Sequence, residues 1–197
     1  FFVIAQQRDT ISKEDLRIAA KVIGIDFTPA MIDKARTNAE KRGLNNVEFR
    51  QGDIEHMPVT ANTADLVVSN CVLNLVPNKD GVFKDIFRVL KAGGHFSISD
   101  VVLVGNLPDA LRKDAEMYAG CVSGAIQKEV YLELIQQNGF EHITIQKEKA
   151  IVIPDDILKN YLNEQELADF KQGNTGIFSI TVFAQKPACC APGSGCC

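Results

Sequence analysis

The sequence predicts an α/β protein whose sheet is mostly parallel with an antiparallel edge, and three observations predict it. Apolar segments of strand length alternate with amphipathic segments of helical length along most of the chain. Asp65 opens an apolar run that ends in Ser69-Asn70-Cys71, as a buried strand with polar groups at its carboxyl end would. The 197 residues are 46% hydrophobic, which is enough to bury a core. In sheets of this class, ligands bind where the strands end.

The first half of the chain carries clear boundary signals. Ser12, followed by acidic residues, suits the start of a short helix. Thr28 and Pro29 suit the N-cap and first position of another helix, and Gly43 suits its end. In order, we expect a helix from 12 to 19, a strand at 21–26, a helix at 29–42, a strand at 47–51, a turn at 52–54 and a strand that opens the stretch 64–76.

The second half continues the alternation and then changes to paired strands. Apolar residues recur at helical spacing from Val82 to Leu90, and a stop at 91–94 follows. We expect a helix at 78–90, a strand at 95–102, a helix at 107–117, a break at 121–124, a helix at 128–138, a strand at 141–152, a helix at 156–170 and a strand at 177–185. The alternating part predicts a sheet covered on both faces, and the last two strands suit an antiparallel hairpin at its edge.

Composition and charge argue against two kinds of partner. The net charge is -4 and charges of both signs are interspersed, so no basic stripe is available for a phosphate backbone. No apolar run reaches the roughly 20 residues of a membrane-spanning helix. The N-terminus carries no charged leader with a cleavage site. We therefore expect no nucleic-acid partner, no membrane and a cytoplasmic location.

The 6 cysteines fall into two groups. Cys71 and Cys121 stand alone inside patterned segments, so this is not the framework of a small disulfide-rich fold. In a reducing compartment all six are thiols and therefore soft ligands. The others lie in a segment of Ala, Pro, Gly, Ser and Cys that predicts a flexible tail. They are Cys189, Cys190, Cys196 and Cys197.

Acidic residues at successive strand ends suit a nucleoside. Asp26 can accept hydrogen bonds from a ribose diol, or it can simply cap the following helix. Asp53 can accept from an adenine amino group with Ile54 against the ring, although Asp beside Gly is common in turns. Met31 can contact the same ligand from the first helical turn, or it can be ordinary packing. Together these positions favour a nucleotide-like cofactor more than each does alone.

The isolated cysteines suit one thiophilic centre. If the break at 121–124 folds over the crevice, Cys71 and Cys121 can share a soft ion, although Cys71 alone is more often a small buried hydrophobe. Zinc fits less well, because neither has a partner at Cys-x-x-Cys spacing. The two vicinal pairs of the tail can chelate trivalent arsenic, or they can bind adventitious metal and oxidise.

Several blocks of residues together carry a family resemblance. They are GIDFTPAMI at 24–32, GDIE at 52–55, SNCVLNL at 69–75, RVLKAGG at 88–94, YAGCVSGA at 118–125 and NTGIFSIT at 174–181. The first four resemble S-adenosylmethionine-dependent methyltransferases with a Rossmann-like fold. The cysteine-bearing blocks and the last block narrow the resemblance to arsenite methyltransferases. The match runs from about residue 21 to residue 186.

The resemblance implies a role for each candidate residue. Cys71 and Cys121 would be the thiolates that hold trivalent arsenic. Arsenic held in this way keeps a nucleophilic lone pair, and in-line attack on a sulfonium methyl needs positioning more than proton transfer. No general base is then required. The residues that would line the adenosine pocket of S-adenosylmethionine are Asp26, Met31, Asp53 and Ile54, with Asn70 at its floor.

The N-terminus departs from the family pattern. The family begins with a strand and a loop of the type Asp-x-Gly-x-Gly-x-Gly, whereas the first glycine here is Gly24 and no cysteine precedes Cys71. Residues 1–5 resemble the helix that follows that loop, or alternatively residues 1–4 pair as a substitute strand. We therefore expect an N-terminally truncated methyltransferase that lacks the first strand and the Gly-rich loop and binds S-adenosylmethionine weakly or not at all.

The expected organisation has three parts: a partial methyltransferase domain at 1–152, a small C-terminal α+β portion at 153–187 and a flexible Cys-rich tail at 188–197. The expected reaction is methyl transfer from S-adenosylmethionine to thiolate-bound trivalent arsenic, in arsenic detoxification. Arsenic would arrive as a thiol adduct, and a small-molecule or protein thiol would be the reductant. Two alternatives remain: another small-molecule methyltransferase of the same fold, or a non-catalytic, thiol-rich metalloid-binding protein.

Overall fold

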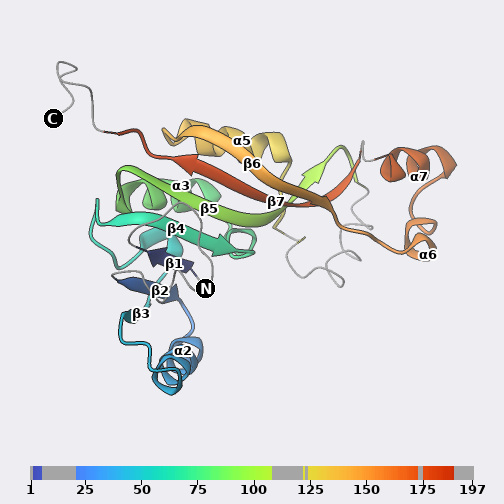
Figure 1. The fold of residues 1–197 in the computed structure, drawn as a ribbon. Helices are drawn as coiled ribbons and strands as arrows, with labels where there is room; N and C mark the ends of the chain where they lie inside the picture. The colour runs from blue at the N-terminus through green and yellow to red at the C-terminus, as the bar shows by residue number, and fades with distance from the viewer. Residues whose placement is uncertain (1, 6–20, 108–121, 123, 173–174, 189–197) are drawn as a thin grey trace, which may run out of the picture.

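The computed structural model describes residues 2–5, 21–107, 122, 124–172 and 175–188, and it organises them around a seven-stranded sheet (Figure 1). The order across the sheet is β3-β2-β1-β4-β5-β7-β6. The strands are β1 (Phe2–Ala5), β2 (Val22–Asp26), β3 (Val47–Gln51), β4 (Ala64–Asn70), β5 (Leu90–Val104), β6 (Glu141–Ala150) and β7 (Gly176–Gln185).

Strands β2, β3, β4, β5 and β6 point the same way. β2 pairs in parallel with β3, and β4 with β5. β1 lies antiparallel between β2 and β4, and β7 lies antiparallel between β5 and β6. The predicted mostly parallel sheet with an antiparallel edge is therefore confirmed.

β1 occupies the central place between β2 and β4. Its residue Val3 pairs with Gly24 on one side and with Val68 on the other. The interpretation of residues 1–5 as part of a helix is therefore wrong, and the alternative of a substitute strand is confirmed. An apolar, β-branched run suits this place, because the backbone groups on the facing edges of β2 and β4 need partners. The place predicted to lack its strand thus holds a short one that runs in the opposite direction.

The helices begin and end largely where the sequence predicts. Thr28 precedes α2, and Gly43 lies beyond its end with a φ of 62°. Asn78 caps α3 by accepting a hydrogen bond from the Gly81 N–H at 3.0 Å. The helices of the described chain are α2 (Pro29–Lys41), α3 (Lys79–Val89), α5 (Lys128–Gln137), α6 (Asp155–Leu158) and α7 (Glu164–Lys171), with short 3-10 turns η1 (Ile54–His56) and η2 (Leu73–Leu75).

The single helix predicted at 156–170 is wrong, because α6 and α7 replace it. Asn163 separates them: its side chain accepts from the Glu166 N–H at 2.9 Å, and the Glu166 carboxylate accepts from the Asn163 N–H at 2.8 Å. This reciprocal cap satisfies backbone donors that a helix start leaves open, so a new helix begins there. The helix expected at 12–19 and nearly all of the one expected at 107–117 lie outside the described residues.

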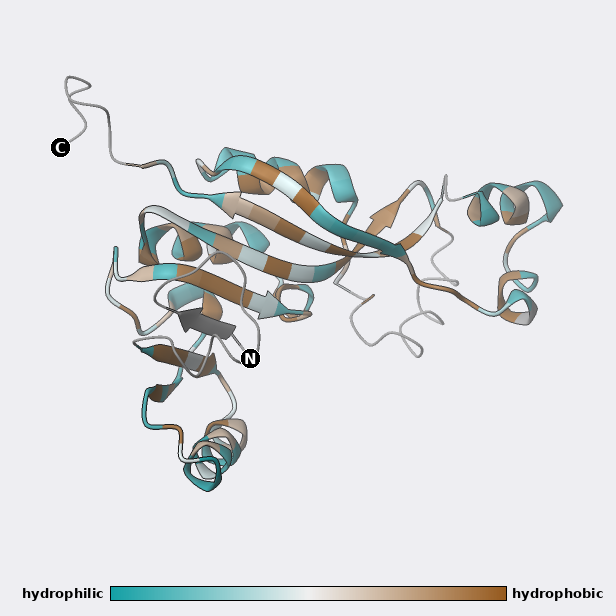
Figure 2. Cartoon of the chain, in the orientation of Figure 1, coloured by the Kyte–Doolittle hydropathy of each residue, from teal (hydrophilic) through white to brown (hydrophobic). Residues whose placement is uncertain are grey.

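The core lies between the sheet and helices α3 and α5. Phe83 of α3 packs edge-on against Tyr131 of α5, with ring centroids 5.5 Å apart, and lies 6.0 Å from the ring of Phe96 on β5. All three side chains are fully buried. Burial alternates along much of β5, and the hydropathy of the strand alternates with it (Figure 2). One face of β5 is thus closed by α3 and α5, and coverage of the other face stays a prediction.

The C-terminal part extends the sheet. β6 and β7 form a long antiparallel pair, and α6 and α7 lie toward one end of it (Figure 1). A second apolar cluster there includes Leu103, Leu158, Leu162 and Ile177. The division of the chain after residues 152 and 187 stays a prediction. None of the helices in the described part of the chain has the length and apolar character to cross a membrane.

Replacing Val3 by proline tests the place of β1. A central strand needs its backbone donors, so we expect Val3→Pro to lose about 1–3 kcal/mol of unfolding free energy beyond the loss in Val3→Ala, which keeps the N–H. Urea denaturation followed by circular dichroism measures both variants. Equal midpoints for the two variants would mean that β1 does not pair in the sheet in solution.

Candidate functional site

A crevice lies at the carboxyl ends of β2 and β3 and beside the segment that follows β4. Its volume is about 320 Å³. The parallel register sets Asp26 beside Gln51, and the Gly52 N–H donates to the Asp26 carbonyl at 3.0 Å. The ends of β2 and β3 therefore meet at one edge. The residues that line the crevice are Ile25, Asp26, Phe27, Gly52, Asp53, Ile54, Glu55, Val72, Leu75, Val76 and Pro77.

Asp26 makes the helix-capping contact that was one of its two predicted roles, and its role toward a ligand stays a prediction. Its Oδ1 accepts a hydrogen bond from the Thr28 N–H at 2.8 Å, which shapes the turn into α2. The same half-buried side chain lines the crevice. One carboxylate oxygen in the turn leaves a second oxygen with capacity to accept from a ligand hydroxyl.

Asp53 and Ile54 line the crevice just after the end of β3. The Asp53 carboxylate caps η1 by accepting from the Glu55 N–H at 2.9 Å, while its side chain remains at the crevice. Ile54 is buried and supplies an apolar wall, and Phe27 is 73% exposed at the rim. Carboxylates beside apolar surface suit a ligand with hydroxyl or amino groups on a flat, poorly hydrated ring.

An ion pair fixes the loop that follows this wall. Asp85 accepts from the buried Met57 N–H at 2.7 Å, and its carboxylate also accepts from Arg88 at 2.6 Å. The Arg88 guanidinium donates onward to the carbonyls of Met57 and Val59 at 2.9 Å and 2.7 Å. Bonding to Asp85 raises the pKa of Arg88. Helix α3 thereby holds the loop after η1 in place.

Two predicted cofactor residues do not line this crevice. Met31 lines a separate hollow between α2 and β3, with Asn38, Leu44 and Phe49. Asn70 ends β4 with an exposed side chain, opposite Ser99 of β5. Their contribution to cofactor binding stays a prediction.

Cys71 lies at the turn that leaves β4. Its N–H donates to the Ser99 carbonyl of β5 at 2.8 Å. Its φ is 54°, in the left-handed region that residues other than glycine rarely adopt. The half-buried side chain packs against the cluster that contains Val101 and Val122, and Val72 beside it lines the crevice. A strained backbone of this kind costs roughly 1–3 kcal/mol and is commonest at functional sites.

Beneath this turn lies a buried polar group that the sequence analysis missed. The Tyr131 hydroxyl lies 3.4 Å from Asp100 Oδ2, and the Asp100 carboxyl is fully buried. Burial raises the pKa of Asp100 to about 7, against the opposing charge of Lys79. Burial also lowers the pKa of Lys79, and burial together with the charge of Asp100 raises that of Tyr131. The carboxyl is thus poised between its neutral and charged forms near neutral pH.

A signal for this group was present in the sequence. Asp100 interrupts an apolar strand-like run, and a charged residue in such a run is rarely buried without a partner. Its partners Lys79 and Tyr131 lie on different helices, and nothing in the sequence around them indicates contact with Asp100. Only packing of α3 and α5 on β5 brings the three together.

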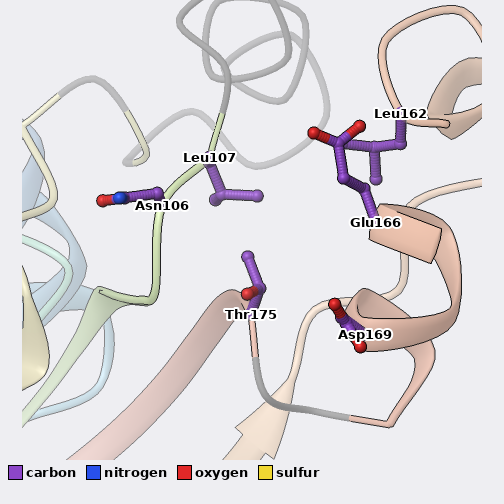
Figure 3. Close-up of a pocket in the computed structure, with 6 residues that line it drawn as sticks. All are labelled: Asn106, Leu107, Leu162, Glu166, Asp169 and Thr175. Carbon is purple, nitrogen blue, oxygen red and sulfur yellow. The ribbon is translucent and has the colours of Figure 1, made fainter.

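The remaining predicted cysteines, Cys121 and the four of the tail, lie outside the described residues. A second hollow, of about 280 Å³, lies between the end of β5, the start of β7 and helix α7 (Figure 3). Glu166 and Asp169 project toward it, but each already accepts a hydrogen bond, from Asn163 N–H and Gln165 respectively. We assign no ligand to this hollow.

The sheet order changes direction between β1 and β4, and the crevice straddles this point. A ligand crevice at such a switch point, with carboxylates at successive strand ends, is typical of the Rossmann-like class of α/β nucleotide-binding folds. A family model described as a methyltransferase domain matches residues 2–139. The chain therefore belongs to the methyltransferase-domain family.

Several relatives of this chain are named as arsenite methyltransferases. An arsenite methyltransferase of Halobacterium salinarum is 41% identical over 85% of this chain, and one of Aquipseudomonas alcaligenes is 32% identical over 87%. The chain spans 40% and 50% of the lengths of these two relatives. The crystal structure of an arsenic(III) S-adenosylmethionine methyltransferase from Chlamydomonas reinhardtii matches with a TM-score of 0.66 and 29% identity, over 87% of this chain and 56% of that one.

Asp100→Asn tests the buried carboxyl through the pH dependence of stability. The pKa of Asp100 rises from 3.8 to about 7 on folding, so between these values the unfolded chain releases a proton that the folded chain keeps. The free energy of unfolding should fall as pH rises through that window, by up to about 4 kcal/mol, and level off above it. Asn remains neutral, so the variant should lose this fall. Urea midpoints at pH 5 and pH 8 measure it, and identical pH slopes would contradict it.

Proposed function

We propose that this chain is the catalytic part of an arsenite methyltransferase, which transfers a methyl group from S-adenosylmethionine to trivalent arsenic held by Cys71 and Cys121. The observation that carries the proposal is the strained Cys71 turn, which is bound to Ser99 and lies beside a crevice with two strand-end carboxylates. The named activity of the relatives supports the same reaction. Because the chain spans about half their length or less, the activity of the whole protein is part of the proposal.

The crevice residues fit the adenosine part of the cofactor. Asp26 has one oxygen beyond its turn to accept from a ribose hydroxyl, and Asp53 can accept from the adenine amino group. Ile54 and Leu75 supply the apolar surface that an adenine ring needs. Met31 and Asn70 do not line this crevice, so they would contact the cofactor only where it extends beyond the crevice.

Methyl transfer to arsenic does not require a general acid or base from the protein. When bound, S-adenosylmethionine would supply a sulfonium methyl group: the arsenic lone pair would form the As–C bond while the electron pair of the C–S bond moved to sulfur. Soft thiolates such as Cys71 hold the arsenic and leave its lone pair available. The turn at Cys71 would hold that thiolate in one position, and positioning is the contribution that an in-line transfer requires.

Thiol chemistry also determines how arsenic would arrive and how it would be reduced. Arsenic would enter as a thiol adduct and exchange onto the protein thiols, and a small-molecule or protein thiol would be the reductant that returns it to the trivalent state. A cytoplasmic location fits because thiols stay reduced there. The tail cysteines would bind arsenic in addition to the core pair.

Asp26→Asn tests the cofactor pocket. Asn keeps an oxygen for the Thr28 turn but loses the charge, and a hydrogen bond to a charged group contributes about 1.5–3 kcal/mol, so the affinity should fall roughly 10- to 100-fold. Calorimetric titration with adenosine isolates this pocket from contacts to the methionyl part, and a second titration uses S-adenosylmethionine. Asp33→Asn, an exposed change on α2, is the matched control. Unchanged adenosine affinity in Asp26→Asn would contradict the assignment.

Cys71→Ser tests the arsenic site. Serine keeps the size of the side chain but removes the soft ligand, so methylation of arsenite should stop. Arsenite titration of the fully reduced chain, with and without serine at the four tail positions, separates the core from the tail. Binding that survives Cys71→Ser but disappears with the tail thiols would favour a metalloid-binding protein. Turnover of an organic acceptor with no turnover of arsenite would favour another small-molecule methyltransferase.

A further inference from the structure

β5 extends beyond the end of β4, and the backbone groups along this unpaired part of its edge bind the segments that form the site. β4 ends at Asn70, opposite Ser99, whereas β5 continues to Val104. Along a strand, every second residue directs its backbone groups to the same edge. The Ser99 carbonyl is bonded by the Cys71 N–H, and two residues further the Val101 carbonyl is bonded by Asn74 Nδ2 at 2.7 Å. Two residues further again, the Leu103 N–H donates to the Ile126 carbonyl at 2.9 Å.

Asn74 is the middle member of this series and is 4% exposed. It belongs to η2, three residues after Cys71, and its side chain donates to β5. Its backbone contacts the segment on the other side: a Cβ built at Gly124 would lie 1.8 Å from the Asn74 carbonyl oxygen. Only glycine permits that approach. Asn74 thus connects the Cys71 turn, the edge of β5 and the segment at 124–126.

The buried amide is retained at a cost in stability. Within the described residues Asn74 Oδ1 has no hydrogen-bond partner, and a buried acceptor of this kind costs about 1–3 kcal/mol. An apolar side chain of similar size would avoid this cost but could not reach the Val101 carbonyl with a donor. The chain thus keeps a costly group at the position that ties the Cys71 turn to β5.

We propose that Asn74 is a positioning residue for Cys71: by bonding Val101 and packing on Gly124, it sets where the Cys71 thiol meets trivalent arsenic. This rests on the proposed function, because it assumes that Cys71 is an arsenic ligand. Asn74 itself contacts neither arsenic nor cofactor in this assignment. It acts by fixing the turn that carries the thiol.

The test measures arsenical affinity in a chain whose four tail cysteines are serine. Phenylarsine oxide, a trivalent arsenical that prefers two thiols, is the probe, and titration calorimetry gives its affinity. Asn74→Leu keeps the branching of the side chain and removes the donor, and we expect affinity to fall about 10-fold or more, as for loss of a group that orients a metal ligand. Ile135→Val, a fully buried change on α5, is the control for lost stability.

A double-mutant cycle separates positioning from a general effect. Adding Asn74→Leu to Cys71→Ser should cause no further loss of affinity, because the thiol that Asn74 positions is already absent. If Asn74→Leu does not fold, Gly124→Ala disturbs the same contact from the other side and should give the same loss. Unchanged affinity in Asn74→Leu, or an equal loss in Ile135→Val, would overturn the proposal. If the parent chain itself binds no arsenical, the proposed function fails rather than the role of Asn74.

Discussion

The parallel pairing of β4 with β5 is the constraint on which the site depends. It aligns the carboxyl ends of the two strands and leaves β5 longer, so the chain leaving β4 must turn against an edge with unsatisfied backbone groups. Cys71 takes a left-handed conformation to make that turn and still donate to Ser99. The same alignment brings Val72 and Leu75 to the crevice that Asp26 and Asp53 line from β2 and β3.

The polar and strained parts of the site lie on a rigid aromatic support. Three groups each reduce stability: a buried carboxyl, a left-handed cysteine, and an amide whose oxygen has no hydrogen-bond partner among the described residues. Directly behind them, Phe83, Phe96 and Tyr131 pack at distances and angles that suit aromatic pairs. Tyr131 belongs to both groups, because its ring is in the core and its hydroxyl reaches Asp100. The core thus offsets the cost of the site at the place where that cost arises.

The elements that could be predicted from the sequence are those whose signals lie within a few neighbouring residues. The strand ending at Asp26 and the helix starting at Pro29 carry their signals within a few residues, and both lie where expected. The break before α7 was missed, although Asn163 and Glu166 mark it locally as a capping box. Asp100 carries a local signal, but its contact with Tyr131 and that of Asn74 with Val101 could not be assigned, because the partners come from elements remote in sequence.

The reversed direction of β1 decides which end of the chain lies near the site. Phe2 pairs beside Ile25 and Ser69, at the crevice edge of the sheet, whereas β7 ends beside His95 at the opposite edge. Beyond β7, the Lys186 amine is held by backbone carbonyls of α3 and β5. In a parallel strand at this place, Ala5 rather than Phe2 would lie at the crevice edge, so the reversal of β1 exchanges which end of the strand is nearest to a bound ligand.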